Sequence, residues 1–358
     1  MLSRMNVSPE GTALLTLVRA ALSESPLETE SLPSALDWNT VLQLARHHRL
    51  EPLLHYGLRH TGFTDIPNRV RAEWEMRRRM SIVSSMYHQA ALNDIAAAFG
   101  DRGVPFVLLK GEGLSRALYP QEGLRPYGDI DLLVRPETYE MAKVILMGLG
   151  FRLRRAAKEA ERLRLFGEIE FDREGPITVT VDLHWNTLMT SWEPRSLLTD
   201  NETWASLGHV RLGNRTIPIL KGEALLIYLC VHFAFHHVFD GLLLLCDLYL
   251  ILRRYAERTD WDRLIAMTDR YQCRHALYYS LFFVKSLMEA PVPNPILDSL
   301  RPNAMIRVLM PTTRMLLRDS LTPQMLERYV KLLLIDTQRG RWRALQAWLR
   351  SSKQLFGR

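Results

Sequence analysis

The sequence predicts an α+β protein in which a small mixed sheet with helices lies between two helical regions. Apolar residues recur at spacings of three and four before residue 100 and again after residue 220, which is the period of amphipathic helices. Short apolar runs of strand length, bounded by turn residues, appear between these regions. We therefore expect an N-terminal helical region over residues 1–99, an α/β core over 100–220 and a C-terminal helical region over 221–358.

Composition narrows the class of protein. The chain has 358 residues and a net charge of +7, which favours anionic partners such as nucleotides, nucleic acid or acidic lipid headgroups. Its three cysteines form no CxxC pair, which argues against a disulfide framework or a zinc cluster and favours buried thiols. The first residues lack the pattern of a signal peptide, and no run of 18 apolar residues occurs. We expect a cytoplasmic enzyme without a transmembrane segment.

The N-terminal region contains four helical patterns. The first covers residues 9–24 and has a proline at its start. The next two run from about residue 38 to His48 and from there to Gly62, where a glycine is expected to end the helix. The fourth is a long pattern over residues 67–99.

The core alternates strand and helix patterns. VPFVLL and DIDLLV are predicted strands, with a helical pattern over 113–119 between them and another over 137–149. Residues 167–173 and 177–185 then form a predicted strand pair, and a hairpin is expected around 212–215. In the second strand of the pair, Asp182 and His184 lie on a polar face, while valine and isoleucine occupy the other.

The C-terminal region begins with a strongly apolar helix over 223–239 that carries His232, His236 and His237. A second apolar helix, over 242–255, contains Asp247. A buried carboxylate needs a partner, so we expect Asp247 to pair with one of those histidines. The end of the chain is basic and places Trp342, Leu345, Trp348 and Leu349 on one helical face. This pattern favours a packing helix over peripheral membrane contact by the basic C-terminus.

Carboxylates spaced two apart at the start of a strand give the first indication of chemistry. Asp129 and Asp131 project to the same face because side chains alternate along a strand. Like charges held this close repel, and a divalent cation between them is the usual reason for the arrangement. Asp182 is a candidate third ligand; the alternative is a solvent-facing aspartate at a strand end. Lys110 and Gly111 follow the first strand and offer a cation and backbone N–H groups to a phosphate.

Several residues near these motifs allow two interpretations. Arg125, in the loop before the aspartates, either binds a phosphate of the nucleotide or is an ordinary loop charge. His232 and His236 have the i, i+4 spacing of metal ligands, but no HExxH glutamate accompanies them. Packed histidines that line a nucleotide cleft are the better hypothesis. His184 contacts a base or acceptor, or is a packed histidine beside Trp185.

The string LLKGEGLSRALYPQEGLRPYGDIDLLV resembles the signature of an uncharacterised nucleotidyltransferase family, nucleotidyltransferase family 5, of the DNA polymerase β-like superfamily. LDWNTVLQLARHHRLEPLL resembles the N-terminal helices of this family, and VDLHWNTL resembles its third-carboxylate strand. GEALLIYLCVHFAFHH and LCDLYLIL resemble its C-terminal helices. The resemblance covers roughly residues 35–255.

The resemblance implies a minimal polymerase β-like core and a Mg²⁺-dependent (or Mn²⁺-dependent) nucleotidyltransferase. An NTP would donate its NMP, with AMP the simplest choice, to a hydroxyl or phosphate of a small molecule, peptide or RNA. Asp129 and Asp131 would hold the metal, and Asp182 would also activate the acceptor hydroxyl. Lys110-Gly111 would stand where the superfamily has a Gly-Ser or Gly-Gly turn. Glu112 departs from the usual serine, and Lys110 would compensate for the lost contact.

Two other functions fit the same sequence. The first keeps the fold and makes the protein a toxin-type enzyme that modifies tRNA or another RNA, which the basic charge permits. The second is a non-catalytic nucleotide-binding or scaffold protein. Glu112 favours the second slightly, whereas the presence of Asp129, Asp131 and Asp182 argues against it.

Overall fold

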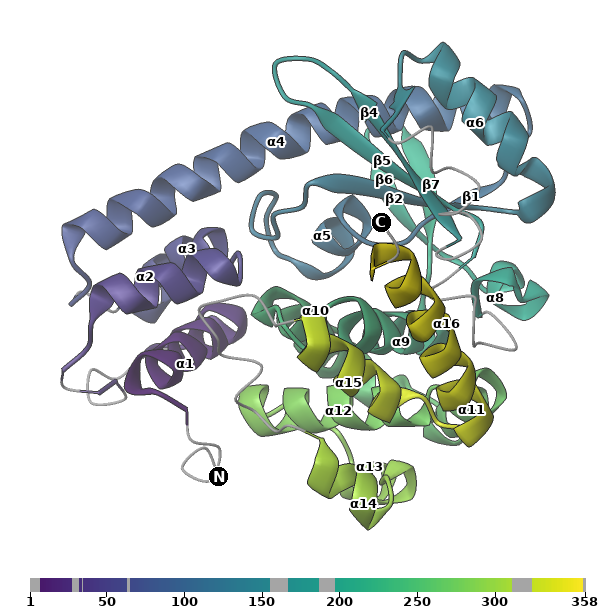
Figure 1. Ribbon diagram of the computed structural model, residues 1–358. Helices are drawn as coiled ribbons and strands as arrows, with labels where there is room; N and C mark the ends of the chain where they lie inside the picture. The colour runs from purple at the N-terminus through teal and green to yellow at the C-terminus, as the bar shows by residue number, and fades with distance from the viewer. Residues whose placement is uncertain are drawn as a thin grey trace.

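A computed structural model of the chain describes residues 7–27, 32–33, 35–62, 65–154, 167–186, 197–310 and 324–356 (Figure 1). It confirms the α+β class: a seven-stranded mixed sheet lies among helices contributed by both ends of the chain. The division into three regions that the sequence predicts stays a prediction. The two helical regions share one apolar core, in which Leu14 and Val18 belong to the same cluster as Leu226 and Leu277.

The four predicted N-terminal helices are present: α1 (Pro9–Ser23), α2 (Trp38–His47), α3 (Glu51–Thr61) and α4 (Asn68–Asp101). The side chain of Ser8 accepts a hydrogen bond from the Gly11 N–H and thereby caps the start of α1. Asp37 caps α2 in the same way through the Asn39 N–H. α4 contains 34 residues, so it is roughly 50 Å long and reaches from α3 to the sheet.

The sheet has the strand order β3-β4-β5-β2-β1-β7-β6. β2 lies between β5, to which it is parallel, and β1, to which it is antiparallel. β1 is parallel to β7. The strands are β1 (Phe106–Leu108), β2 (Asp129–Val134), β3 (Arg152–Leu153), β4 (Glu168–Arg173), β5 (Val179–His184), β6 (Gly208–Leu212) and β7 (Arg215–Ile219).

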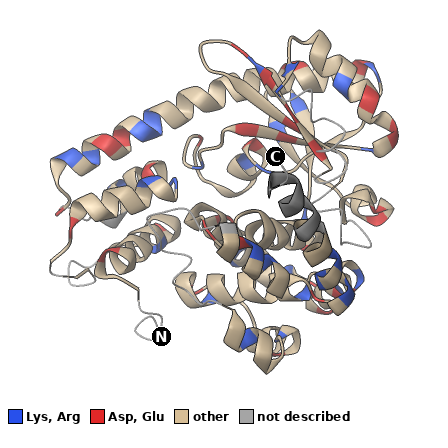
Figure 2. Cartoon of the chain, in the orientation of Figure 1, with Lys and Arg blue, Asp and Glu red and all other residues tan. Residues whose placement is uncertain are grey.

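The two faces of the sheet are chemically different. On one face Ile130 and Leu132 pack with Val181 and with residues of α4 such as Phe99, and α6 (Tyr139–Gly148) completes this layer. The opposite face carries the acidic residues of β2, β4 and β5 (Figure 2). Because strand residues alternate between faces, the apolar residues anchor each strand and direct the intervening carboxylates to the other side.

Helices that follow the sheet pack on the side opposite α4 and α6 (Figure 1). They are α9 (Gly222–Val231), α10 (Leu242–Tyr255), α11 (Trp261–Tyr271), α12 (Arg274–Met288), α13 (Asn294–Leu300), α14 (Ala304–Leu309), α15 (Gln324–Leu334) and α16 (Gln338–Phe356). Within the core lie α5 (Glu112–Leu118) and α8 (Asn201–Ala205). Short 3-10 turns are η3 (Pro136–Thr138), η5 (Leu197–Thr199) and η7 (Ala256–Arg258).

The helix predicted over residues 223–239 is interrupted. α9 ends at Val231, and a π-helical turn, η6 (His232–His236), follows it. Val238 and Phe239 then have φ values of 49° and 61°, a left-handed conformation that ends the helix before Asp240. A π turn is rare and is found mostly at functional sites. The predicted hairpin at residues 212–215 is confirmed, and all three cysteines are buried and free.

The last helix, α16, carries the face that was predicted to pack. The Trp348 side chain packs partly buried against the main core, whereas Trp342 is 64% exposed. The predicted packing face of α16 is thus only partly buried, and the side chain of Leu349 lies outside the described residues. None of the described helices combines the length and the apolar character that crossing a bilayer requires.

Candidate active site

The strands β2 and β5 bring the predicted carboxylates together. Asp131 lies directly opposite Asp182 in the parallel pair, and Asp129 lies opposite Thr180. Side-chain alternation therefore places all three aspartates on the same face of the sheet. Asp131 is only 1% exposed, because it lies at the centre of this face under the helices of the C-terminal region.

Two carboxylate oxygens in this cluster are buried without a hydrogen-bond partner among the described residues: Oδ2 of Asp131 and Oδ1 of Asp182. Leaving such a polar atom unpaired costs about 1–3 kcal/mol. Asp131, Asp182 and His184 can each direct one ligand atom into a group whose members lie within 4.8 Å of one another. These donors fit a divalent cation, which binds carboxylate oxygens readily. Asp129 is outside that tight group, and its role as a ligand stays a prediction.

The carboxylates of the cluster do not share one protonation behaviour. Burial would raise the pKa of Asp131, but the Lys110 ammonium and the His184 ring hold it well below its usual range. Burial and the nearby charge of Asp131 raise the pKa of Asp182 to about 8. The charge of Asp131, followed by burial, also raises the pKa of Asp129. A bound cation would favour ionisation of all three groups.

The Lys110-Gly111 turn lies against this cluster, and its predicted role in phosphate binding stays a prediction. The Lys110 Nζ is 2.8 Å from Oδ1 of Asp131, and this contact offsets burial and raises the pKa of the lysine. Gly111 begins α5 with φ 53° and ψ −116°. A Cβ added to Gly111 would lie 3.2 Å from the backbone oxygen of Asp129. Glycine therefore allows the turn to pass close to the start of β2.

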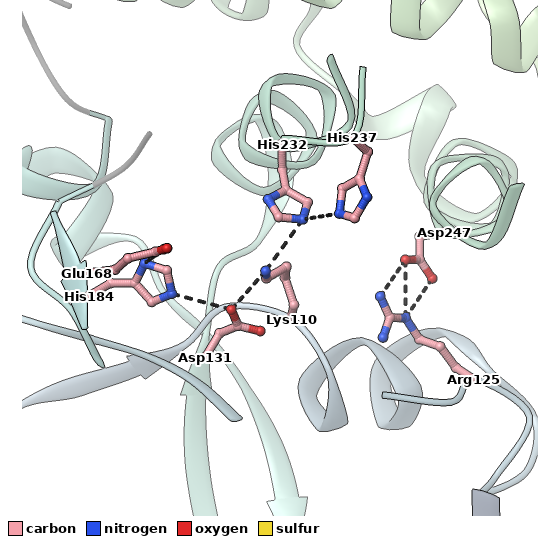
Figure 3. Close-up of polar contacts among 8 residues, drawn as sticks. All are labelled: Lys110, Arg125, Asp131, Glu168, His184, His232, His237 and Asp247. Carbon is pink, nitrogen blue, oxygen red and sulfur yellow. Dashed lines mark hydrogen bonds and ion pairs between the residues drawn. The ribbon is translucent and has the colours of Figure 1, made fainter. Parts of the chain in front are cut away.

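His184 connects Asp131 to a carboxylate that sequence reasoning missed. Its Nε2 lies 3.3 Å from Oδ1 of Asp131, and its Nδ1 lies 3.3 Å from Oε2 of Glu168 on β4 (Figure 3). Burial would lower the pKa of His184, but these two carboxylates raise it. Glu168 and His184 are direct partners in the antiparallel pair β4–β5. The register of the predicted strand pair was therefore the signal that could have identified Glu168.

Aromatic side chains from α9, η6 and the residue after η6 face Lys110. Tyr228, His232 and His236 are four residues apart, and their rings form a stacked row with centroid distances of 5.9 and 4.8 Å. The His232 Nε2 is 3.4 Å from the Lys110 Nζ and 3.1 Å from the His237 Nε2 (Figure 3). Burial and the Lys110 charge lower the pKa of His232 and His236, and they lower that of His237 to about 4. The three histidines are therefore uncharged at neutral pH.

A cavity of about 180 Å³ lies between the aspartates, the Lys110-Gly111 turn and the aromatic rings that face Lys110. Five of the eight residues predicted for the site line it: Lys110, Asp129, Asp182, His232 and His236. Its other lining residues are Glu168, His184, Tyr228 and His237. Asp131 contacts Lys110 and His184, which both line the cavity, and Gly111 continues the turn.

Arg125 does not line this cavity. Its guanidinium donates hydrogen bonds of 2.8–3.1 Å to both oxygens of Asp247 (Figure 3). Asp247 also accepts one from the Tyr119 hydroxyl. The expected pairing of Asp247 with a histidine is therefore wrong, because the loop that carries Arg125 packs on α10. A role of Arg125 in nucleotide binding stays a prediction, although Asp247 already binds its guanidinium.

Glu112, which departs from the family pattern, is also absent from the cavity lining. Its carboxylate is buried at the start of α5, where Arg116 and Tyr127 donate hydrogen bonds to it. The side chain is held by contacts around α5 and leaves the space beside Lys110 open.

Comparison with known proteins identifies the family of the chain. The profile of the family described as "Uncharacterised nucleotidyltransferase" matches residues 34–289, which is most of the chain. The protein therefore belongs to this nucleotidyltransferase family and is a transferase of phosphorus-containing groups. No curated protein matches the chain.

Proposed function

We propose that this nucleotidyltransferase moves an NMP, with AMP the simplest choice, from an NTP to a hydroxyl or phosphate of its acceptor. Asp129, Asp131 and Asp182 would hold Mg²⁺ or Mn²⁺. One observation supports this proposal above the others. Oδ2 of Asp131 and Oδ1 of Asp182 are buried without partners on facing strands, beside a buried lysine. A purely structural carboxylate pair would have its hydrogen bonds satisfied.

The chain's own residues have separate parts in the reaction. Lys110 would bind the phosphates of the NTP, since it is the only lysine that lines the described cavity. His184, held by Glu168, would fix the orientation of Asp131. A bound divalent cation would neutralise charge on the phosphates and favour deprotonation of the acceptor hydroxyl. Asp182 would accept the hydroxyl proton, because it lines the cavity and a bound cation would keep its carboxylate ionised.

The bond changes follow from this assignment. The acceptor oxygen forms a bond to the α-phosphorus, and the bond from that phosphorus to the bridging oxygen of the β-phosphate breaks. Pyrophosphate leaves with the electron pair of the broken bond. The cavity of about 180 Å³ is smaller than the roughly 300–1,000 Å³ of a typical ligand pocket. We therefore place the phosphates inside it, with the base and ribose outside the cavity.

Label transfer tests the proposal. The protein would be incubated with Mg²⁺, each NTP labelled at the α-phosphate, and a cell extract as the pool of acceptors. We expect label in a covalent product with the wild type and none with Asp129→Ala. Asp172→Asn is the matched control, because Asp172 lies on the same sheet face but pairs with Arg154 outside the cavity. Ribonuclease and protease treatment of the product would identify an RNA, peptide or small-molecule acceptor.

Two outcomes would contradict the proposal. One is the absence of label transfer with every NTP together with the absence of a thermal shift on addition of NTP and Mg²⁺, which would favour a scaffold protein. The other is full activity of Asp129→Ala, which would show that the carboxylate cluster is not the active site.

A further inference from the structure

The strand β6 forms a free edge of the sheet. It is the last strand in the order and pairs only with β7 among the described strands. A free edge presents backbone N–H and C=O groups that another extended chain can pair with. Which groups point outward follows from the register of the β6–β7 hairpin.

A two-residue turn joins the two strands, and Leu212 lies opposite Arg215. Residues that flank such a turn exchange hydrogen bonds, and bonded pairs alternate with non-bonded pairs along the hairpin. His209 and Arg211 are therefore in non-bonded pairs. Pro218 supports this register, because it lies opposite His209 and has no N–H to donate. The backbone groups of His209 and Arg211 point away from β7, and no described residue pairs with them.

The largest described cavity, of about 940 Å³, lies along this edge. All four residues from Gly208 to Arg211 line it, so the cavity runs beside the strand over most of its length. The end of α5 and the start of α9 form other parts of its wall. An extended segment placed here would lie beside the outward backbone groups of β6.

The charges of this cavity are predominantly positive. Arg211, Lys221 and Arg258 line it, and none of them forms an ion pair with a described residue. Two glutamates also line it: the first is neutralised by an ion pair, whereas the second keeps its charge, so the three unpaired cations outnumber one unpaired carboxylate. Glu122 pairs with Arg116, and Glu223 accepts a hydrogen bond from the backbone N–H of Asp260. The free charge of the cavity would therefore attract acidic side chains.

A second copy of this chain is a poor occupant of the edge. Antiparallel pairing of two β6 strands about Val210 would place His209 of each strand opposite Arg211 of the other. Neither side chain is acidic, so this pairing would give Arg211 no counter-charge. Charge complementarity instead favours a different chain that alternates acidic and apolar residues, with the apolar side chains toward Val210 and Leu225.

We propose that β6 and the adjoining cavity bind an acidic peptide segment of a partner protein in extended conformation, as an additional strand of the sheet. This mode takes affinity from backbone hydrogen bonds and specificity from side-chain contacts. The inference does not depend on the proposed function, because none of its residues belongs to the candidate active site.

Three labelled peptides test this proposal with the full-length protein, by fluorescence anisotropy. One alternates glutamate and valine, one alternates lysine and valine, and one alternates glutamate and proline. The third has the charge of the first but lacks half of its N–H donors. We expect the glutamate–valine peptide to bind at least ~10-fold more tightly than either of the others. Binding is also expected to slow hydrogen exchange at the amides of His209 and Arg211.

Variants of the edge complete the test. His209→Pro removes an outward N–H without touching the pairing with β7, and we expect it to weaken binding at least ~10-fold. Arg211→Glu reverses one charge and is expected to weaken binding even if the proline variant folds poorly. Arg215→Ala, on the neighbouring strand outside the cavity, is the matched control and should bind like the wild type.

Three results would overturn the proposal. The first is that the glutamate–valine peptide binds no more tightly than the glutamate–proline peptide, which would indicate charge attraction alone, or that all three peptides bind equally, which would indicate no specific site. The second is unchanged binding by both edge variants when their circular dichroism matches the wild type. The third is slow exchange of the His209 and Arg211 amides in the free protein, which would mean that the chain already covers its own edge.

Discussion

Two buried cation–carboxylate pairs, Arg125–Asp247 and Lys110–Asp131, differ in how completely their hydrogen bonds are satisfied (Figure 3). Asp247 accepts bonds from Arg125 at both oxygens and a further one from Tyr119. Asp131 uses only Oδ1, which contacts Lys110 and His184, while its Oδ2 has no partner among the described residues.

This difference distinguishes a structural ion pair from a binding site. Arg125–Asp247 connects the loop before β2 to α10, and its complete bonding offsets the cost of burying two charges. Lys110–Asp131 lies beside a cavity and two further carboxylates, so its capacity for ligands is not used up within the protein. Stability should therefore depend on the first pair and activity on the second.

The largest expected effect tests the second pair. Asp131→Asn keeps the shape of the side chain but removes its charge, and we expect nucleotidyl transfer to fall roughly 1000-fold or more. The measurement is the initial rate of label transfer at saturating Mg²⁺ and NTP, with circular dichroism as the control for folding. A variant that keeps a tenth of the wild-type rate would contradict the assignment of Asp131 to catalysis.

The first pair should respond in stability. Asp247→Ala leaves the Arg125 guanidinium buried and unpaired, so we expect the free energy of unfolding to fall by about 3–5 kcal/mol. Urea denaturation measures this change. Replacing both partners, as Asp247→Leu with Arg125→Met, should recover much of the loss, because no buried charge then remains. A fall in the free energy of unfolding below about 1 kcal/mol in the single variant would mean that the pair does not stabilise the fold.

Magnesium should show that Asp131 holds the cation without any measurement of turnover. A ligand present at 100 times its dissociation constant stabilises the folded state by about 2.7 kcal/mol. We expect Mg²⁺ to raise the melting temperature of the wild type and of Asp172→Asn but not of Asp131→Asn. Equal stabilisation of all three proteins would place the cation elsewhere.

The last prediction concerns pH, where the effect within one pH unit is the smallest. The pKa of Asp182 is raised to about 8 in the folded, metal-free protein, above its value in the unfolded chain. Between these two values the folded state binds more protons, so stability falls as pH rises from about 4 to 8. Its slope for one proton is at most about 1.4 kcal/mol per pH unit. Asp182→Asn should make the free energy of unfolding, measured by urea denaturation, depend less on pH. An equally steep pH dependence in the variant would contradict the raised pKa of Asp182.

The sequence predicted the local elements and the central motif because these depend on neighbouring residues. The strand that contains Asp129 and Asp131 and the four N-terminal helices follow from periodicity and turn residues. The approach of Asp182 to Asp131 depends on strand pairing, which the resemblance to a family supplied and which periodicity alone does not encode.

Other features depended on tertiary contacts that local sequence does not specify. The partner of Asp247 lies 122 residues away, so the nearby histidines were the wrong choice. Glu168 was missed because its function arises from a register with His184 rather than from a motif. The π turn at His232 was also missed, because its sequence continues an ordinary apolar helical pattern.

The strand order has a consequence for how the chain folds. β1 pairs with β7, which is synthesised much later. The apolar face of α4 has no sheet to pack against until β2 and β5 have paired. Pairings between distant segments slow folding, because the chain must close long loops before it gains their contacts. During synthesis α4 therefore emerges with Leu92, Ile95 and Phe99 exposed. We expect the nascent chain to need protection against aggregation until the last strands leave the ribosome.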